Sequence, residues 1–283
     1  MANKTIAIIT DKPGIFFKTG YFVACLVPYW QERQLKVVIG SKWSLPKADV
    51  AILHVDVTEI PFFFKLLSKV YPIVLNGCFT NNSKRKISKN ILSREDNYNG
   101  PVIIKTNNNY GGLQEINKRR NKNRILHDLT QLPSIDWSKI KGILPGKYPV
   151  IDSKENVPEK VWKNRYLVVE KFIPELNSDG LFCLRACLFF GNVELNILVS
   201  SREPVIKGNN LCSWEITSAP APDQLRDLKK DLCMDFGRLD YVMHEEEVIL
   251  YDANKTASLS RQASVDLAEQ VVRPLASGID SFL

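Results

Sequence analysis

The sequence has few of the residues that bind zinc or form disulfides. Its six cysteines and three histidines are scattered over 283 residues, and no two cysteines form a CxxC pair. Because structural zinc sites need closely spaced Cys and His ligands, we expect no zinc centre. Cys183 and Cys187 stand in an apolar run and are expected to be small core residues. Scattered cysteines fit a reducing compartment, so we expect a cytoplasmic protein.

Long hydrophobic runs are also missing. A membrane-spanning helix needs about 20 apolar residues, and no run of the sequence approaches that length. Only the short apolar run Ile6–Ile9 lies between Met1–Lys4 and Asp11, which is not the pattern of a secretory signal peptide. A GxGxxG fingerprint is absent as well. We therefore expect neither a membrane partner nor a dinucleotide-binding unit of that kind.

Basic residues exceed acidic ones, with 38 against 31 and a net charge of +7. Such an excess favours phosphate ligands, an anionic surface or nucleic acid. Much of it lies in two short segments, Asn81–Asn90 and Asn117–Arg124. We interpret these as local basic loops rather than a long nucleic-acid groove, and aromatic-rich RNA motifs are missing. A nucleic-acid partner is therefore not expected. It is kept as an alternative in which Lys118, Arg119 and Arg120 would carry the binding.

Strand and helix patterns alternate over the first quarter of the chain. Strand-like runs are expected at 5–10, 36–39, 50–53 and 73–75, and helical spacing at 16–34 and 57–70. Pro28 falls inside the first helical pattern and would kink or end it. This alternation predicts a small parallel α/β domain over residues 1–76.

The rest of the chain differs in character. Residues 77–165 are polar and basic, with one strand-like run at 101–106, and are expected to form a second domain. Residues 166–283 are rich in strand patterns and form the third. Expected elements there are a strand at 166–172, a hairpin around Gly191-Asn192, a helix at 219–234, an acidic hairpin and a closing helix at 262–279. The overall prediction is an α/β (α+β) fold.

The most informative segment is the acidic hairpin, 235–256. Strand alternation puts Asp252 and Asn254 on one face, roughly 7 Å apart at about 3.3 Å rise per residue. If the turn centres on Glu246, Asp240 lies opposite Asp252 and joins them. Two carboxylates and an amide oxygen are hard ligands that suit Mg²⁺. The alternative is an ordinary solvent-facing hairpin with acidic residues.

A lysine beside a glycine turn suggests a second binding feature. Lys105 ends a strand-like run, and Gly111 and Gly112 close the polar turn that follows. A lysine there can bind phosphate as a point charge, and the backbone N–H groups exposed by the glycines can hold further oxygens. A purely structural turn remains the alternative.

Further charged residues interrupt apolar strands. Arg185 lies within an apolar run, where an unpaired arginine is costly, so it must meet water, an acid or a bound anion. Arg202 follows in a loop. Arg238 shares a strand face with Asp240 and is a candidate ion-pair partner or phosphate ligand. In the strand Val168–Glu175 the alternatives are an edge strand with one wet face, or a linker that reads an adenine edge.

Taken in order, these motifs resemble the ATP-grasp superfamily of carboxylate–amine ligases. The ordered set is a small α/β domain, the strand end Leu75-Asn76, a basic segment, PVIIKT followed by Gly-Gly, LVVEKFIPE, an arginine in the next hairpin, DFGRLDYV and LYDANKT. The resemblance spans most of the chain. It implies a pre-ATP-grasp domain at 1–76, a small lobe at 77–165 and a C-terminal lobe at 166–283.

The resemblance also implies roles for single residues. Lys105 corresponds to a lysine on the α and β phosphates, with Lys89 or Lys86 as the second ATP lysine. Gly111 and Gly112 correspond to the phosphate-covering loop. The remaining assignments are the adenine-facing linker, Glu170, Lys171, Phe172 and Ile173; the ribose-binding acid, Glu175; the magnesium ligands, Asp240, Asp252 and Asn254; and the arginines at the transferred phosphate or acceptor, Arg185 and Arg202.

Three departures from the family pattern stand out. Asp252 replaces a common Glu, the span between Asn76 and Lys105 is compressed, and the glycine loop is short. The implied activity uses ATP and Mg²⁺ to phosphorylate a carboxylate, which an amine then attacks to give an amide or peptide bond. Small-molecule or peptide acids and amines are the implied substrates. A small-molecule kinase on the same fold, a non-catalytic nucleotide-binding protein and a homodimeric state all stay open.

Overall fold

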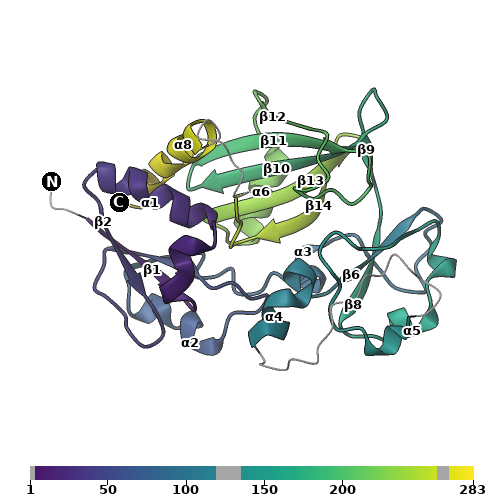
Figure 1. Ribbon diagram of the computed structural model, residues 1–283, viewed down its shortest axis with the longest axis horizontal. Helices are drawn as coiled ribbons and strands as arrows, with labels where there is room; N and C mark the ends of the chain where they lie inside the picture. Colours follow the sequence, from purple (N-terminus) through teal and green to yellow (C-terminus); the bar gives the residue numbers. More distant parts are fainter. Residues whose placement is uncertain (1–3, 119–134, 260–267) are drawn as a thin grey trace.

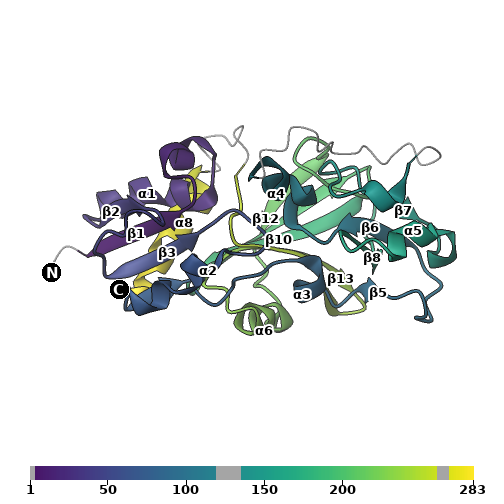
Figure 2. The same cartoon turned by 90° about the horizontal axis from the view of Figure 1, so that it is seen from below.

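The computed structural model describes residues 4–118, 135–259 and 268–283. The strands of these residues form three sheets (Figures 1 and 2). Arg119 and Arg120, the candidates for nucleic-acid binding, lie outside the described residues. Within the described residues, no helix is long and apolar enough to cross a membrane.

The N-terminal unit is a parallel four-stranded sheet, as the alternating pattern predicted. Its order is β2-β1-β3-β4 and every neighbouring pair runs parallel. The strands are β1 (Thr5–Thr10), β2 (Lys36–Gly40), β3 (Val50–His54) and β4 (Ile73–Leu75). All of β3 is buried, as expected for a central strand covered on both faces. Its carboxyl end leads directly to Asp56, which lines the candidate site described below.

Two helical predictions for this unit need correction. The helix α1 (Phe22–Glu32) begins later than predicted and contains Pro28 without ending there. Residues 57–70 form only a short α2 (Phe62–Lys65) and a 3₁₀ turn η2 (Leu67–Lys69), not one long helix. Pro61 stands at the N-cap of α2, and a residue that precedes proline is pushed into extended backbone. The helix therefore cannot begin at residue 57.

The second sheet belongs to the small lobe and has the order β5-β8-β6-β7. Its strands are antiparallel: β5 (Ile91–Leu92), β6 (Val102–Thr106), β7 (Val150–Ile151) and β8 (Leu167–Lys171). Short helices α3 (Lys84–Ile87), α4 (Leu113–Lys118) and α5 (Glu159–Trp162) accompany it. Because β8 pairs with β6 along its whole length, the small lobe extends past the boundary predicted at residue 165, to Lys171.

The third sheet has the order β12-β11-β10-β13-β14, with β9 on β10. Its strands are β9 (Glu175–Leu176), β10 (Phe182–Phe190), β11 (Val193–Ser201), β12 (Ser213–Thr217), β13 (Phe236–His244) and β14 (Glu247–Asn254). The predicted hairpin around Gly191-Asn192 is confirmed by the pairing of β10 with β11. The predicted helix at 219–234 is shorter, α6 (Asp223–Asp231).

Alternation along β10 distributes its side chains between two cores. Leu188 and Phe190 join a core with α1 and α8 (Arg273–Ala276), whereas Cys187 and Phe189 join a core with Leu225 of α6. Successive strand residues face opposite sides of a sheet. The first core also contains Ile6 and Ile8 of β1 and therefore joins the N-terminal unit to the C-terminal lobe. The closing segment described from residue 268 is broken into η7 (Ala268–Val272), α8 and η8 (Ser277–Phe282), and part of the predicted helix at 262–279 lies outside the described residues.

The acidic hairpin β13–β14 has the predicted pairing for a different reason from the one assumed. Its turn is the two residues Glu245-Glu246, both with positive φ (47° and 67°), as in the tight turns that favour hairpins. That turn alone would place Asp240 opposite Tyr251. A register shift next to Asp240 adds one residue to β14, so Asp240 pairs with Asp252.

Candidate active site

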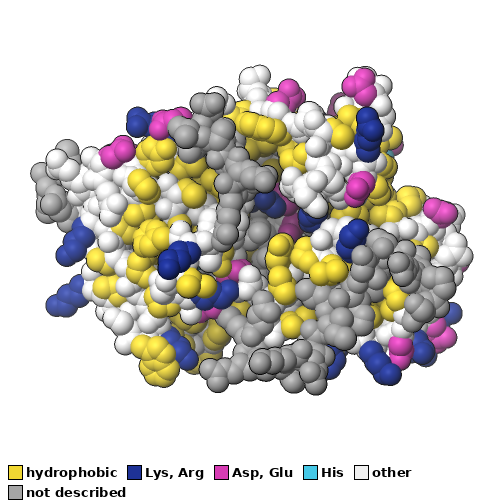
Figure 3. Space-filling view, in the orientation of Figure 1, with side chains coloured by type: hydrophobic (Ala, Val, Ile, Leu, Met, Phe, Trp, Pro, Cys, Tyr) yellow, Lys and Arg dark blue, Asp and Glu magenta, His cyan; other side chains and the backbone are white. Residues whose placement is uncertain are grey.

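A cavity of about 490 Å³ is lined by all three parts of the chain. That size is typical of small-molecule sites. Figure 3 shows basic and acidic side chains in the hollow near the middle of the molecule. Charged side chains on its wall comprise five basic and three acidic ones: Lys12, Lys84, Lys105, Lys207, Arg238, Asp56, Asp240 and Asp252. The surplus of positive charge suits an anionic ligand.

One face of the acidic hairpin forms the floor of the cavity. Arg238, Asp240, Asp252 and Asn254 all line it, because cross-strand pairing sets Arg238 opposite Asn254 and Asp240 opposite Asp252. The Arg238 guanidinium donates to Asp240 Oδ2 at 2.9 Å. This pairing raises the pKa of Arg238 mainly through the charge of Asp240. The three predicted metal-binding residues therefore converge as the sequence indicated.

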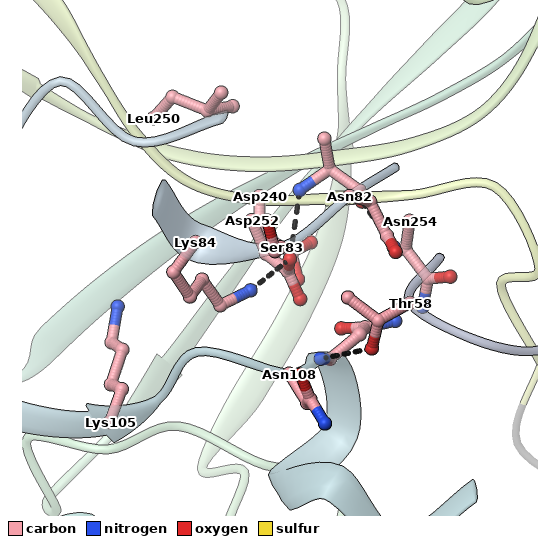
Figure 4. A network of polar contacts seen from close by, with 12 residues as sticks. Thr58, Asn82, Ser83, Lys84, Lys105, Asn108, Asp240, Leu250, Asp252 and Asn254 are labelled. Atoms are coloured by element: carbon pink, nitrogen blue, oxygen red, sulfur yellow. Dashed lines mark hydrogen bonds and ion pairs between the residues drawn. The ribbon is translucent and has the colours of Figure 1, made fainter. Parts of the chain in front are cut away.

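Lys84, which the sequence analysis did not select, reaches this floor from α3. Its ammonium donates to Asp252 Oδ1 at 2.5 Å, and its side chain is only 8% exposed. Figure 4 shows the Lys84 ammonium directed at the carboxylates of Asp240 and Asp252. Burial opposes ionisation of Asp252, yet the nearby charges, Lys84 first among them, leave its pKa below the usual value.

Lys86 and Lys89, the predicted early ATP lysines, do not reach the cavity. Both are exposed, and Lys89 lines a separate cavity beside α6 and β14. The reason is helical phase: Lys84 and Ile87 are three residues apart on α3 and both are buried. The apolar Ile87 was the sequence signal that could have identified Lys84 as the inward lysine.

Lys105 lies at the end of β6, in the cavity. Its ammonium is 2.7 Å from Glu170 Oε2 and lies over the Tyr251 ring at 5.0 Å. Glu170 is 2% exposed, and its other oxygen has no hydrogen-bond partner. Glu170 therefore sits beside the lysine, one strand away in the sheet, and is not among the residues lining the cavity. Phosphate binding by Lys105 stays a prediction.

The glycine turn is held by backbone contacts. Gly111 has φ of 68°, and a Cβ added there would lie 2.0 Å from the carbonyl oxygen of Ile143. The Gly111 carbonyl accepts from the Ile143 N–H at 3.1 Å. Gly111 and Gly112 are buried, and neither lines the cavity, whereas Asn109 and Tyr110 before them do. The exposed glycine backbone expected to cover a phosphate is thus not what the structure shows.

The linker at the end of β8 contributes the Phe172 side chain to the cavity, and two of its N–H groups are already bonded. Phe172 lines the cavity, but Lys171 and Ile173 do not. The N–H groups of Lys171 and Phe172 donate to the carbonyls of Asn90 and Pro101, at 2.8 and 2.9 Å. The Ile173 carbonyl accepts from the Tyr251 hydroxyl. Reading of an adenine edge by these two N–H groups is therefore not supported.

Arg185 and Glu175 satisfy each other away from the cavity. Glu175 accepts from Arg185 Nε at 3.0 Å and from its Nη2 at 2.6 Å, and it also accepts from the Met243 N–H at 2.8 Å. Neither side chain lines the cavity, and Arg202 is exposed and does not line it either. The structure does not bring these residues to the cavity, and their contacts with a ribose or a phosphate stay predictions. Because β9 pairs with β10, Glu175 and Arg185 lie in the same sheet and form an ion pair there.

Lys207 is another basic side chain that lines the cavity. It lies in the loop between β11 and β12, and its ammonium sits 5.8 Å from the centre of the Tyr148 ring at the cavity wall. Although the residue as a whole is exposed, desolvation around the ammonium lowers its pKa, against the opposing effects of Asp240 and Asp252. A loop position carries no periodic signal, so only tertiary structure reveals this placement.

The floor of the cavity fits a hard cation in part. Asp240 Oδ1 is buried and has no hydrogen-bond partner, although Arg238 Nε lies 2.8 Å away without the alignment of a hydrogen bond. The oxygen of Asn254 already accepts from the Thr256 N–H. Among the described residues, no cluster of three or more His, Cys, Asp or Glu could hold a metal ion. The donor set is two carboxylates and one amide, and hard oxygens of this kind are ones that Mg²⁺ prefers.

Comparison with known proteins gives the fold. No protein-family model and no curated protein matches the sequence. Among solved structures, a D-alanine–D-alanine ligase from Bacillus anthracis is similar with a TM-score of 0.51 and 12% identity, over 99% of this chain and 96% of that one. The ATP-grasp ligase PsnB, complexed with a minimal precursor, is similar with a TM-score of 0.53 and 8% identity, over 99% of both chains. A RimK domain ATP-grasp protein from Sphaerobacter thermophilus DSM 20745 is similar with a TM-score of 0.50 and 12% identity, over 98% of both chains.

These likenesses define the class of structure: the chain has the ATP-grasp fold. The neighbours named above include two ligases, the D-alanine–D-alanine ligase and PsnB, the second complexed with a minimal precursor.

Proposed function

We propose that this protein is an ATP-dependent carboxylate–amine ligase. One observation carries the proposal: four cations from separate elements surround the paired carboxylates of the hairpin within an ATP-grasp fold. Lys84 comes from α3, Lys105 from β6, Lys207 from the β11–β12 loop and Arg238 from β13. A triphosphate supplies the matching negative charge, and fixed cations stabilise charge that moves during phosphoryl transfer.

The apolar part of the same cavity fits the base of ATP. Ile103, Phe172, Pro174, Phe182 and Leu184 line it. Phe172 and Phe182 have ring centres 6.5 Å apart, and aromatic and aliphatic walls are typical for a planar ligand. The phosphates would then extend toward Lys105 and the hairpin floor.

Magnesium is part of this proposal. Asp240, Asp252 and Asn254 would hold it, and when bound it would neutralise phosphate oxygens. Lys84 already contacts Asp252, so this lysine orients one carboxylate of the floor. The cations of the chain hold the phosphates in line with the incoming carboxylate, and this positioning is the main contribution of such a site.

The reaction balances with ordinary groups. ATP phosphorylates the substrate carboxylate and ADP leaves. The amine then forms the C–N bond as the C–O bond to phosphate breaks. Of the two protons lost by the ammonium, one leaves with phosphate and one goes to solvent. No nucleophilic side chain is required.

The direct test is thermal stability with Mg²⁺ and a non-hydrolysable ATP analogue, followed by ADP release with acid and amine pairs. A ligand that binds the native state raises the melting temperature, so we expect a Mg²⁺-dependent shift in the wild type that Asp252→Ala removes. ADP release that needs both an acid and an amine supports a ligase, whereas release with a single acceptor would indicate a kinase. Unchanged ADP release in Asp240→Ala and Asp252→Ala would contradict the proposal.

A further inference from the structure

The end of the cavity formed by the N-terminal unit has a different chemistry from the phosphate end. Lys12, Tyr21 and Asp56 line it, together with the side chains of Gln114 and Thr256. Here one cation faces one anion, and the remaining groups are neutral hydrogen-bonding side chains. Such a balanced pair does not favour a triphosphate, because the carboxylate beside the lysine repels phosphate oxygens.

Asp56 is held in place by two hydroxyl donors. Its Oδ2 accepts from the Tyr21 hydroxyl at 2.8 Å, and its Oδ1 accepts from the Thr256 hydroxyl at 3.0 Å. Burial is the main cause that raises the pKa of Tyr21, with Asp56 second, so the phenol stays protonated and donates. The carboxylate is 14% exposed, and it faces the cavity with defined orientation.

Lys12 has its short contact with a neutral group. Its ammonium donates to Gln114 Oε1 at 2.7 Å, whereas Asp56 Oδ2 is 3.9 Å away. The ion pair is therefore loose, and both charges keep room for ligand groups of opposite sign. A ligand that carries an ammonium and a carboxylate side by side matches this arrangement.

The pair also has a fixed relation to the hairpin floor. Thr256 donates to Asp56 and lies 3.4 Å from Asn254 Oδ1. Asp56 is thus connected through one hydroxyl to Asn254, one of the residues proposed to hold magnesium. Asp56 is linked to the floor through Thr256, whereas the short contact of Lys12 is to Gln114 of α4. For this reason the amine at Asp56, and not the carboxylate at Lys12, is assigned as the reacting group.

We infer that the amine substrate is a free amino acid, with its ammonium bound by Asp56 and its carboxylate bound by Lys12. This inference rests on the proposed ligase function and names the substrate class for it. Free amino acids carry both charges and therefore bind. An analogue that lacks its ammonium leaves Asp56 without a partner, and one that lacks its carboxylate leaves Lys12 without a partner. Discrimination against such analogues is strong when buried polar groups lose their partner.

The test measures thermal shifts and affinities of the full chain with Mg²⁺ and a non-hydrolysable ATP analogue present. The probes are single free amino acids, the primary amines that lack their carboxylate, and the acids that lack their amine. We expect a further shift from one or a few amino acids, and at least about tenfold weaker binding of the matched analogues, because each loses a charge-assisted contact.

Variants separate this inference from the proposed function. Lys12→Met keeps both hydrogen bonds to Asp56 and should fold, and Asp56→Asn keeps the shape of the side chain. Both should lose the amino-acid shift and retain the nucleotide shift. Lys69→Met, at an exposed lysine of the same unit, is the matched control and should retain both shifts.

The outcomes are distinct. A nucleotide shift with no amino-acid shift overturns this inference alone, as does equal binding of amines that lack a carboxylate. Retention of the amino-acid shift in Lys12→Met and Asp56→Asn also overturns it. Absence of the nucleotide shift in the wild type contradicts the proposed ligase function instead.

Discussion

The assignment of Lys84, rather than Lys89, to the nucleotide site gives the sharpest prediction. Both lysines belong to the same basic segment, but only Lys84 is buried at the cavity, with its ammonium 2.5 Å from Asp252. Lys84→Met keeps the length and apolar stem of the side chain and removes its charge. Lys89→Met makes the same change on an exposed residue.

The expected magnitudes follow from the contacts of Lys84. A hydrogen bond to a charged group contributes about 1.5–3 kcal/mol, so loss of one phosphate contact should weaken binding of the Mg²⁺–ATP analogue roughly 10- to 100-fold. The stability cost of leaving Asp252 without this partner is smaller than for a fully buried pair. Asp252 is 25% exposed and also feels Lys105 and Lys207, so we expect a loss of about 1–2 kcal/mol.

The assay is titration calorimetry with the analogue, with denaturant unfolding as a check that each variant is folded. Lys89→Met should bind the nucleotide like the wild type. Equal affinities of Lys84→Met and wild type, with weaker binding by Lys89→Met, would refute the assignment and the helical-phase argument behind it.

Three further predictions concern stability. Burial lowers the pKa of His54 to about 4, so as pH falls below 6.5 the unfolded chain is protonated at this residue before the folded chain is. The wild type should therefore lose about 2 kcal/mol of stability between pH 7 and pH 5 through His54. In denaturant unfolding, the stability of His54→Gln should depend on pH by that much less. Gly111→Ala combines a positive φ with a clash against a carbonyl and should lower the stability by roughly 2–5 kcal/mol. Gly180→Ala, with φ of 73° and nothing within 4 Å of the added Cβ, should lower it by only about 1–2 kcal/mol. Equal losses of stability would contradict the packing argument. Arg185→Leu leaves Glu175 with only the Met243 N–H and should cost about 1–3 kcal/mol while nucleotide affinity stays unchanged; a large loss of affinity in calorimetry would return Arg185 to the site.

Local patterns predicted the fold where a single periodicity dominated. The parallel N-terminal sheet follows from apolar runs of strand length separated by helical spacing. The shared face of Asp252 and Asn254 follows from the two-residue period of a strand. The lobe boundary predicted at residue 165 was misplaced because β8 would have the same apolar pattern in either lobe. Only its pairing with β6 assigns β8 to the small lobe. The predicted exposure of the Gly111 and Gly112 backbone was wrong because the sequence does not show which backbone lies against Gly111.

By itself the sequence determined the strands of the N-terminal unit, the position of Lys105 at a strand end and the face shared by Asp252 and Asn254, because each depends on neighbours within a few residues. Tertiary structure decided which charges meet. It selected Lys84 over Lys89, brought Lys207 to the cavity from a loop, paired Arg185 with Glu175 and set Lys12 beside Asp56. Charges act through space over a few ångströms, and the partners here are up to 168 residues apart along the chain, so no local pattern specifies them.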